Sequence, residues 1–233
     1  MAILGVAYDL EGTVVDLEDA HHQGHLQVMR EVGMDLSLER AIKEIPHFIG
    51  GPHTKIIEEI FAVGNKTLTI DEIDRRDRAY FREYRATAEI KPRPGFLEVH
   101  HAFVARGLQV AIGSLTERED AFLILDRSGL RALFPRECIV LAEDVTRVKP
   151  APDVFVTTAE RMGIYPCTQL VFEDSPNGVR AARAAGSLAV GMPVYDFSTA
   201  IIPLTEAGAC RIFMDWHEVS VDNLLKDLEG EVS

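Results

Sequence analysis

The sequence predicts an α/β fold in which a doubly wound, Rossmann-like parallel sheet is interrupted by an all-helical insertion. Short apolar runs alternate with stretches of helical length from residue 96 onwards, which is typical of parallel strands joined by helices. The opening strand is followed instead by helical periodicity over residues 17–84. We therefore expect an α/β domain of residues 1–15 and 90–233, with a helical domain of residues 16–89 inserted after its first strand.

Each element of this fold has its own signal. Ile3 to Tyr8 is an apolar run that ends at an acidic turn, which indicates a buried strand. Residues 71–86 form a charged stretch whose apolar side chains recur at helical spacing. KPRPG, residues 91–95, then ends the insertion. Beyond it we expect helices at 96–106, 117–128, 152–162 and 177–185, and strands at 108–114, 138–142, 170–174 and 188–192.

Composition and charge narrow the class of protein. A hydrophobic share of 47% in 233 residues is enough for a sizeable core. The formal net charge of -13 argues against non-specific binding of nucleic acid, which needs positive charge against phosphate. No membrane span, secretory signal or disulfide framework is evident, and the three cysteines fit free thiols in a reducing cytosol. We expect a cytoplasmic protein, a monomer or weak homodimer, with neither a nucleic-acid nor a membrane partner.

Polar side chains follow four of the expected strands. They are Asp9 and Glu11, then Ser114 and Thr116, then Lys149, and finally Glu173 and Asp174. The carboxyl ends of parallel strands meet at one edge of a sheet, where ligands bind. Crowded carboxylates suit Mg²⁺, and a hydroxyl and a lysine suit the oxygens of a phosphoryl group. A carboxylate could then attack phosphorus to form an aspartyl-phosphate, while a second carboxyl serves as general acid and base.

Four stretches in order, AYDLEGTVVD, AIGSLT, VKPAPDVF and VFEDSPNGVRAARAAG, resemble the four motifs of the haloacid dehalogenase-like (HAD) hydrolase superfamily. The last two are similar to the branch that contains β-phosphoglucomutase and related sugar phosphatases. The resemblance runs from Ile3 to about Met192, and the insertion falls where that branch has a helical cap. It implies an enzyme that binds Mg²⁺ and a small phosphorylated metabolite.

The resemblance also implies roles for individual residues around the metal. Asp9 would be the nucleophile and a Mg²⁺ ligand. The backbone carbonyl of Glu11 would be a second ligand and Asp174 a third. Glu173 would lie beside the metal, in contact with it directly or through water.

Further residues are expected to meet the phosphate and the rest of the substrate. Ser114 would hold a phosphate oxygen, although a serine at a strand end can also serve only as a helix cap. Lys149 would neutralise the phosphoryl charge and the nucleophile, the alternative being a solvated loop lysine. Thr116, beside Ser114, and two residues of the cap, His21 and His53, are candidates for substrate binding.

Glu11 departs from the family pattern, which has an aspartate two residues after the nucleophile. Its extra methylene moves the carboxyl by more than ~1 Å, which can cost ~100-fold in rate if the pocket is not reshaped. We favour Glu11 as a displaced general acid/base, because it keeps an ionisable proton carrier. The alternative is a catalyst with impaired turnover.

Four functions remain open on the sequence. The favoured one is a Mg²⁺-dependent phosphatase acting on a small metabolite, with sugar phosphates as the leading class. A β-phosphoglucomutase-type mutase would share every core residue and return the phosphate to its bound intermediate. A phosphonatase would need a Schiff-base lysine where this cap has His53, with Lys55 two residues beyond. A non-catalytic protein that binds phosphorylated metabolites would result if Glu11 stalls the chemistry.

Overall fold

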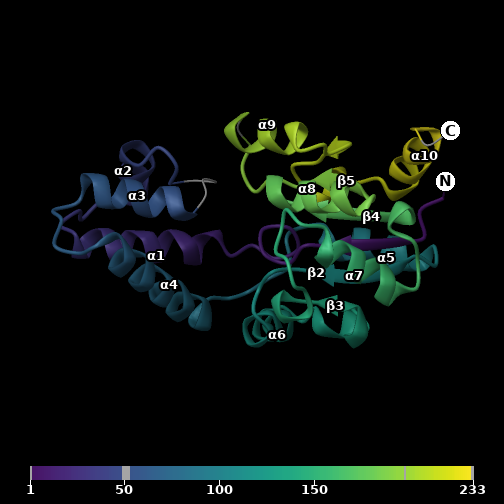
Figure 1. The fold of residues 1–233 in the computed structure, drawn as a ribbon, viewed down its shortest axis with the longest axis horizontal. Coiled ribbons are helices and arrows are strands. Elements are labelled where there is room, and N and C mark those ends of the chain that lie inside the picture. The colour runs from purple at the N-terminus through teal and green to yellow at the C-terminus, as the bar shows by residue number, and fades with distance from the viewer. Residues whose placement is uncertain (1, 49–52, 197, 232–233) are drawn as a thin grey trace. The chain divides into compact units, whose positions relative to one another are not determined.

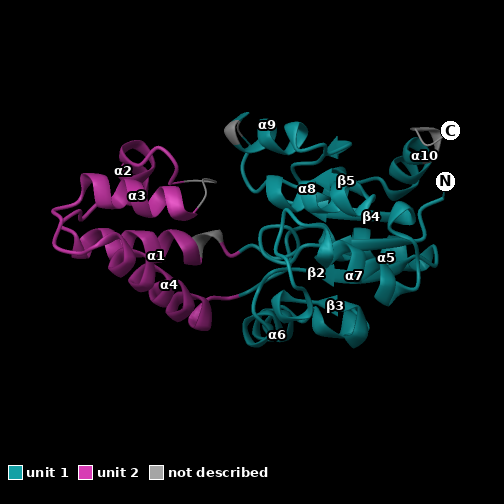
Figure 2. Ribbon diagram, viewed as in Figure 1, with its two compact units in different colours: residues 1–16, 90–233 teal, residues 17–89 magenta. Residues whose placement is uncertain are grey.

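The computed structural model describes residues 2–48, 53–196 and 198–231 (Figure 1). It divides into two compact units, one made of Met1–Asp16 with Ile90–Ser233 and the other of Leu17–Glu89 (Figure 2). We call the first unit the core domain and the second the cap. Within the described residues, no helix is long and apolar enough to cross a membrane.

In the described part of the core domain, six parallel strands form one sheet in the order β3-β2-β1-β4-β5-β6 (Figure 1). Their bounds are β1 Gly5–Tyr8, β2 Gln109–Gly113, β3 Ile139–Val140, β4 Gln169–Glu173, β5 Leu188–Gly191 and β6 Arg211–Ile212. The predicted α/β class with its parallel sheet is confirmed. Because β1 lies between β2 and β4, Tyr8 pairs with Ile112 on one side and with Phe172 on the other.

Helices and short turns complete the core domain. The α-helices are α5 Phe96–Ala105, α6 Arg118–Arg127, α7 Asp153–Met162, α8 Pro176–Ala185, α9 Ser198–Glu206 and α10 Val221–Glu231. The 3-10 helices are η1 Arg131–Leu133, η2 Arg136–Cys138, η3 Ala142–Asp144, η4 Pro166–Thr168 and η5 Trp216–Glu218. The strand β6 and the helices α9 and α10 were not predicted. The strand β6 is only two half-buried residues long and gives no apolar run.

Side chains of the central strands alternate between two faces of the sheet, as the pleat requires. On one face, Ala7 and Val171 belong to a buried cluster that includes Phe155 from α7 and residues of α8. On the other face, the ring of Tyr8 packs edge-on against Phe96 of α5, with centroids 5.3 Å apart. Both faces are therefore covered, which is what a parallel sheet with apolar side chains on each face needs.

The cap is a helical unit with a core of its own. Its helices are α1 Glu18–Glu31, α2 Leu38–Glu44, α3 His53–Val63 and α4 Ile70–Thr87. Apolar side chains from all four helices form one buried cluster, including Met29, Ile57 and Ile73. The helix α4 begins at a capping box, in which the Thr69 hydroxyl accepts from the backbone of Glu72 and the Glu72 carboxylate accepts in return.

Candidate active site

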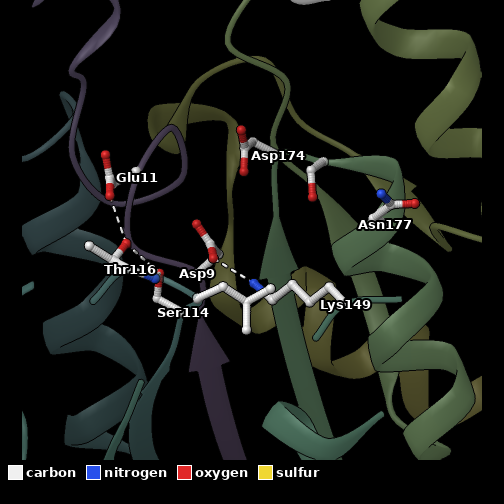
Figure 3. Close-up of a pocket in the computed structure, with 9 residues that line it drawn as sticks. Asp9, Glu11, Ser114, Thr116, Lys149, Asp174 and Asn177 are labelled. Carbon is white, nitrogen blue, oxygen red and sulfur yellow. Dashed lines mark hydrogen bonds and ion pairs between the residues drawn. The ribbon is translucent and has the colours of Figure 1, made fainter. Parts of the chain in front are cut away.

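A pocket of about 430 Å³ in the core domain collects the polar side chains that follow the central strands (Figure 3). Its lining residues are Asp9, Glu11, Ser114, Leu115, Thr116, Lys149, Asp174, Ser175 and Asn177. β1 delivers Asp9 and Glu11, β2 delivers Ser114, and β4 is followed by Asp174. The parallel register explains this meeting, because neighbouring strands of one direction end at the same edge.

Lys149 is the cation at the centre of the pocket. Its Nζ donates to Asp9 Oδ1 at 2.6 Å, to Glu173 Oε1 at 2.5 Å and to the backbone carbonyl of Gly113 at 3.1 Å. The lysine side chain is 7% exposed, so these three acceptors take its three protons. Burial by itself would lower the pKa of Lys149, but Asp9 and Glu173 raise it well above its usual value. The ammonium therefore stays charged beside Asp9.

Glu173 is fully buried and is held on both carboxylate oxygens. Oε1 accepts from Lys149, while Oε2 accepts from the backbone N–H and the hydroxyl of Ser175, at 3.0 and 2.9 Å. Ser175 in turn caps α8, since its hydroxyl accepts from the backbone N–H of Gly178. Glu173 thus contacts Lys149 from outside the pocket lining. The carboxylates in the lining are those of Asp9, Glu11 and Asp174.

Asp174 lies beside the turn after β1. Its Oδ1 accepts from the Thr13 hydroxyl at 3.2 Å. Gly12 makes this close approach feasible: its φ is +81°, and a Cβ there would lie 2.4 Å from Asp174 Oδ2. Burial, followed by the charges of Glu173 and Asp9, raises the pKa of Asp174 well above its usual value. Lys149 acts on Asp174 in the opposite direction but is outweighed, so Asp174 adds to a local excess of negative charge.

Asp9 is subject to opposing influences. Its pKa is raised, first by burial and then by the charges of Glu173 and Glu11, while Lys149 acts in the opposite direction. One ammonium does not offset the carboxylates around it, which is the electrostatic setting that favours a bound cation. Among the described residues, no group of three or more His, Cys, Asp or Glu side chains is arranged to hold a metal. A hard cation here would therefore need oxygen from the backbone, water or substrate besides Asp9 and Asp174.

The pocket wall opposite Lys149 carries a chain of hydroxyl and carboxylate groups (Figure 3). Thr116 Oγ1 donates to Glu11 Oε1 at 2.6 Å. The same Oγ1 lies 2.9 Å from Ser114 Oγ. Ser114 is 2% exposed, so its hydroxyl is confined to this chain and to the adjoining pocket.

Comparison with known proteins identifies the family. Residues 6–192 match the family model of haloacid dehalogenase-like hydrolases. The chain belongs to this family. It is 31% identical over 186 residues to the fructose-1-phosphate phosphatase YqaB of Escherichia coli, covering 80% of this chain and 94% of that protein. It is also 26% identical over 210 residues to the phosphorylated carbohydrates phosphatase of Thermotoga maritima, with 89% and 92% covered.

Solved structures agree on the fold of this HAD hydrolase. The crystal structure of a putative β-phosphoglucomutase from Thermotoga maritima is similar to this chain, with a TM-score of 0.73 and 23% sequence identity. The match covers 97% of this chain and 100% of that one. These matches confirm the predicted superfamily and its β-phosphoglucomutase and sugar-phosphatase branch. They also confirm that the protein is a phosphoric monoester hydrolase.

Two residues predicted to bind substrate, His21 and His53, belong to the cap of the hydrolase, where they lie near one another. His53 Nε2 is 2.7 Å from Asp74 Oδ1, at the start of α3. The ring of His21 stacks on Phe81 at 3.8 Å. Burial, and then the neighbouring imidazoles of His25 and His53, lower the pKa of His21 to about 3, so its ring is neutral at neutral pH. Their role in binding stays a prediction.

Several supporting residues were missed by sequence reasoning. Asn177 lines the pocket at the start of α8, and its place within the fourth motif, VFEDSPNGVRAARAAG, was the signal available. The buried Trp216 donates through Nε1 to the backbone carbonyl of Thr13 at 3.0 Å. No local pattern signals this contact, because 203 residues separate the two positions.

Proposed function

We propose that this hydrolase is a Mg²⁺-dependent cytoplasmic phosphatase that removes the phosphate group from a small phosphorylated metabolite, with sugar phosphates as the leading class. The observation that carries the proposal is the pocket in which Lys149 binds Asp9 while Asp174 and Glu11 face the same space. The activities named for the Escherichia coli and Thermotoga maritima relatives, on fructose 1-phosphate and on phosphorylated carbohydrates, support the substrate class.

Magnesium fits the donors of this pocket. The carboxylates of Asp9 and Asp174 and the backbone carbonyl of Glu11 would hold the ion, and all three are oxygen ligands of the kind Mg²⁺ prefers. When bound, the ion supplies positive charge to a phosphate oxygen and offsets the repulsion between the substrate and the carboxylates. The raised pKa of Asp174 supports this assignment, since a nearby cation would relieve the cost of its charge.

The chain's own residues then carry the reaction. A carboxylate oxygen of Asp9 attacks phosphorus, and the bond from phosphorus to the leaving alcohol breaks. Glu11 gives its proton to the departing oxygen. Glu11 next takes a proton from water, which attacks the aspartyl-phosphate and releases inorganic phosphate with Asp9 restored. Lys149 stays beside Asp9 throughout and offsets the charge of the phosphoryl group.

The cap gives no support to phosphonate hydrolysis. That chemistry needs a lysine that loses its proton readily to form a Schiff base. Lys55 is exposed, and its hydrogen bond with Glu58 raises the pKa of its ammonium group. His53 cannot form a Schiff base. The experiment below distinguishes a phosphatase from a mutase that returns the phosphate to a bound intermediate.

The test is phosphate release from a panel of phosphorylated sugars, nucleotides and glycolytic acids, with Mg²⁺ and with EDTA. We expect turnover that needs Mg²⁺ and that Asp9→Asn abolishes, because the amide is no nucleophile. Asp196→Asn, at an exposed carboxylate outside the pocket, is the matched control and should keep activity. Tight binding of esters without turnover would overturn the proposal. Conversion of β-glucose 1-phosphate to glucose 6-phosphate, with a glucose 1,6-bisphosphate primer, would replace it by a mutase.

A further inference from the structure

The carboxyl of Glu11 is held by a neighbour although its side chain is long. A glutamate has one more rotatable bond than the aspartate of the family pattern, so a free carboxyl here would sample more orientations. In the structure Oε1 of Glu11 accepts a hydrogen bond from Thr116 Oγ1 at 2.6 Å. Figure 3 shows the second carboxylate oxygen pointing away from Thr116. The hydrogen bond from Thr116 thus fixes the position of Oε1.

The direction of the hydrogen bonds in this chain follows from the groups involved. An ionised carboxylate only accepts, so the single hydroxyl proton of Thr116 points at Glu11. The 2.9 Å contact between Ser114 Oγ and Thr116 Oγ1 must then have Ser114 as its donor. Ser114 Oγ also accepts from the backbone N–H of Thr116 at 3.3 Å. The orientation of Thr116 is therefore fixed from the side opposite to Glu11.

This arrangement leaves Thr116 without a proton to donate to the substrate. Its one proton is used by Glu11, and one lone pair receives Ser114. A hydroxyl in that position has no donor left for a phosphate or sugar oxygen. The same hydrogen bond keeps Oε1 of Glu11 an acceptor, so a proton on Glu11 belongs to the other oxygen.

We propose that Thr116 is a positioning residue that orients Glu11 for proton transfer to the leaving oxygen. Its hydroxyl compensates for the longer side chain at position 11 by fixing where the carboxyl lies. The inference rests on the proposed function, since Glu11 is the general acid/base there. In this role Thr116 acts on the reaction through Glu11.

The experiment compares two esters and two substitutions at one position. Thr116→Val removes the hydroxyl and keeps the branched shape, whereas Thr116→Ser keeps the hydroxyl. A sugar phosphate releases a poor leaving group that needs a proton, while p-nitrophenyl phosphate releases a good one that does not. We expect Thr116→Val to lower kcat/KM on the sugar phosphate by about 10- to 100-fold and on p-nitrophenyl phosphate by less than about threefold. Thr116→Ser should stay within about threefold of the parent on both esters.

A double-mutant cycle with Glu11→Gln tests the route of the effect. If Thr116 acts through Glu11, Thr116→Val should change kcat/KM by less than about twofold in the Glu11→Gln protein. An equal loss on both esters, or the same loss with and without Glu11, would overturn the inference and indicate a structural role. A rise in KM at constant kcat would assign Thr116 to substrate binding instead.

Failure of the inference is distinct from failure of the proposed function. If Glu11→Gln lowers turnover of the sugar phosphate and Thr116→Val does not, the function stands and the positioning role is wrong. If the parent hydrolyses neither ester, or Glu11→Gln is as fast as the parent, the role of Glu11 falls and the positioning role falls with it. Melting temperatures of all variants show whether each remains folded.

Discussion

Arg93 donates through Nη1 to the backbone carbonyl of Gly12 at 2.6 Å, and so ties the segment of the core domain that precedes α5 to the turn after β1. The same guanidinium donates to the carbonyls of Met192, Pro193 and Met214 at 3.0 to 3.2 Å. One side chain thereby joins three segments that are distant in sequence. Because the turn at Gly12 follows directly after Glu11, the shape of the pocket depends on this contact.

Replacing Arg93 should destabilise the core domain. Arg93→Met leaves four carbonyl oxygens without their charged donor, and we expect the free energy of unfolding to fall by about 2–4 kcal/mol. Arg93→Lys should retain only part of the lost stability, because an ammonium group lacks the forked donor geometry of a guanidinium. Urea unfolding followed by the fluorescence of Trp216 measures both. Arg147→Met, at an exposed ion pair with Asp153, is the control and should cost less than about 1 kcal/mol.

Arg93 also shows where sequence reasoning stops. KPRPG could be recognised as a break in the chain, but the four partners of its arginine lie in segments that only the fold brings together. The pocket was more accessible to prediction. Its charged residues follow apolar runs such as that before Asp9, and parallel strands deliver their ends to one edge.

The partners of individual side chains were beyond the reach of the sequence. Spacing placed Glu173 and Asp174 at the same strand end, yet it did not reveal that Glu173 is enclosed by Lys149 and Ser175. Nor did it reveal that Thr116 contacts Glu11, since that depends on rotamers of residues 105 positions apart. Pattern and spacing therefore reach the strand ends, and tertiary packing decides the hydrogen bonds.

Gly178 leaves room for the carboxyl of Glu173, and an alanine there should disrupt the site. A Cβ at position 178 would lie 1.7 Å from Glu173 Oε1, the oxygen that binds Lys149. The carboxyl of Glu173 must therefore move, which breaks its buried ion pair with Lys149. We expect Gly178→Ala to lower kcat by at least about tenfold and to lower the melting temperature as well. Gly107→Ala is the control, because its Cβ would meet nothing within 4 Å although its φ is +78°. The free energy of unfolding of Gly107→Ala should fall by about 1 kcal/mol, and its activity should be unchanged. Full activity of Gly178→Ala would contradict this account.

Tyr8 carries a hydroxyl that the fold does not use. The residue is 0% exposed, and among the described residues its oxygen has no hydrogen-bond partner. Tyr8→Phe removes a buried polar atom and keeps the ring against Phe172, so we expect the free energy of unfolding to rise by about 1 kcal/mol. Tyr80→Phe should lower the free energy of unfolding instead, because the Tyr80 hydroxyl donates a hydrogen bond to Glu31 in the cap. A lower melting temperature for Tyr8→Phe would show that its hydroxyl has a partner.

His100 should make the core domain sensitive to acid. Burial, and then the neighbouring His101, lower the pKa of His100 from 6.5 to about 4, against the effect of the Leu133 carbonyl. Above pH 6.5 the ring is neutral in both the folded and the unfolded chain and contributes no pH dependence. As the pH falls from 6.5 towards 4, the unfolded chain binds a proton that the folded chain does not, so stability is lost.

Between pH 6.5 and pH 4, the free energy of unfolding should fall by about 1.4 kcal/mol for each pH unit because of His100. Between pH 7.5 and pH 5, the parent should lose about 2 kcal/mol more than His100→Phe, which keeps an aromatic ring against Phe96 and Phe134. Urea unfolding at the two pH values measures the difference. His101→Gln, at the exposed neighbouring position, removes the smaller cause of the shift and leaves His100 buried, so most of the pH dependence of the parent should remain. Equal losses in the parent and in His100→Phe would mean that His100 takes up its proton in the folded chain as readily as in the unfolded one.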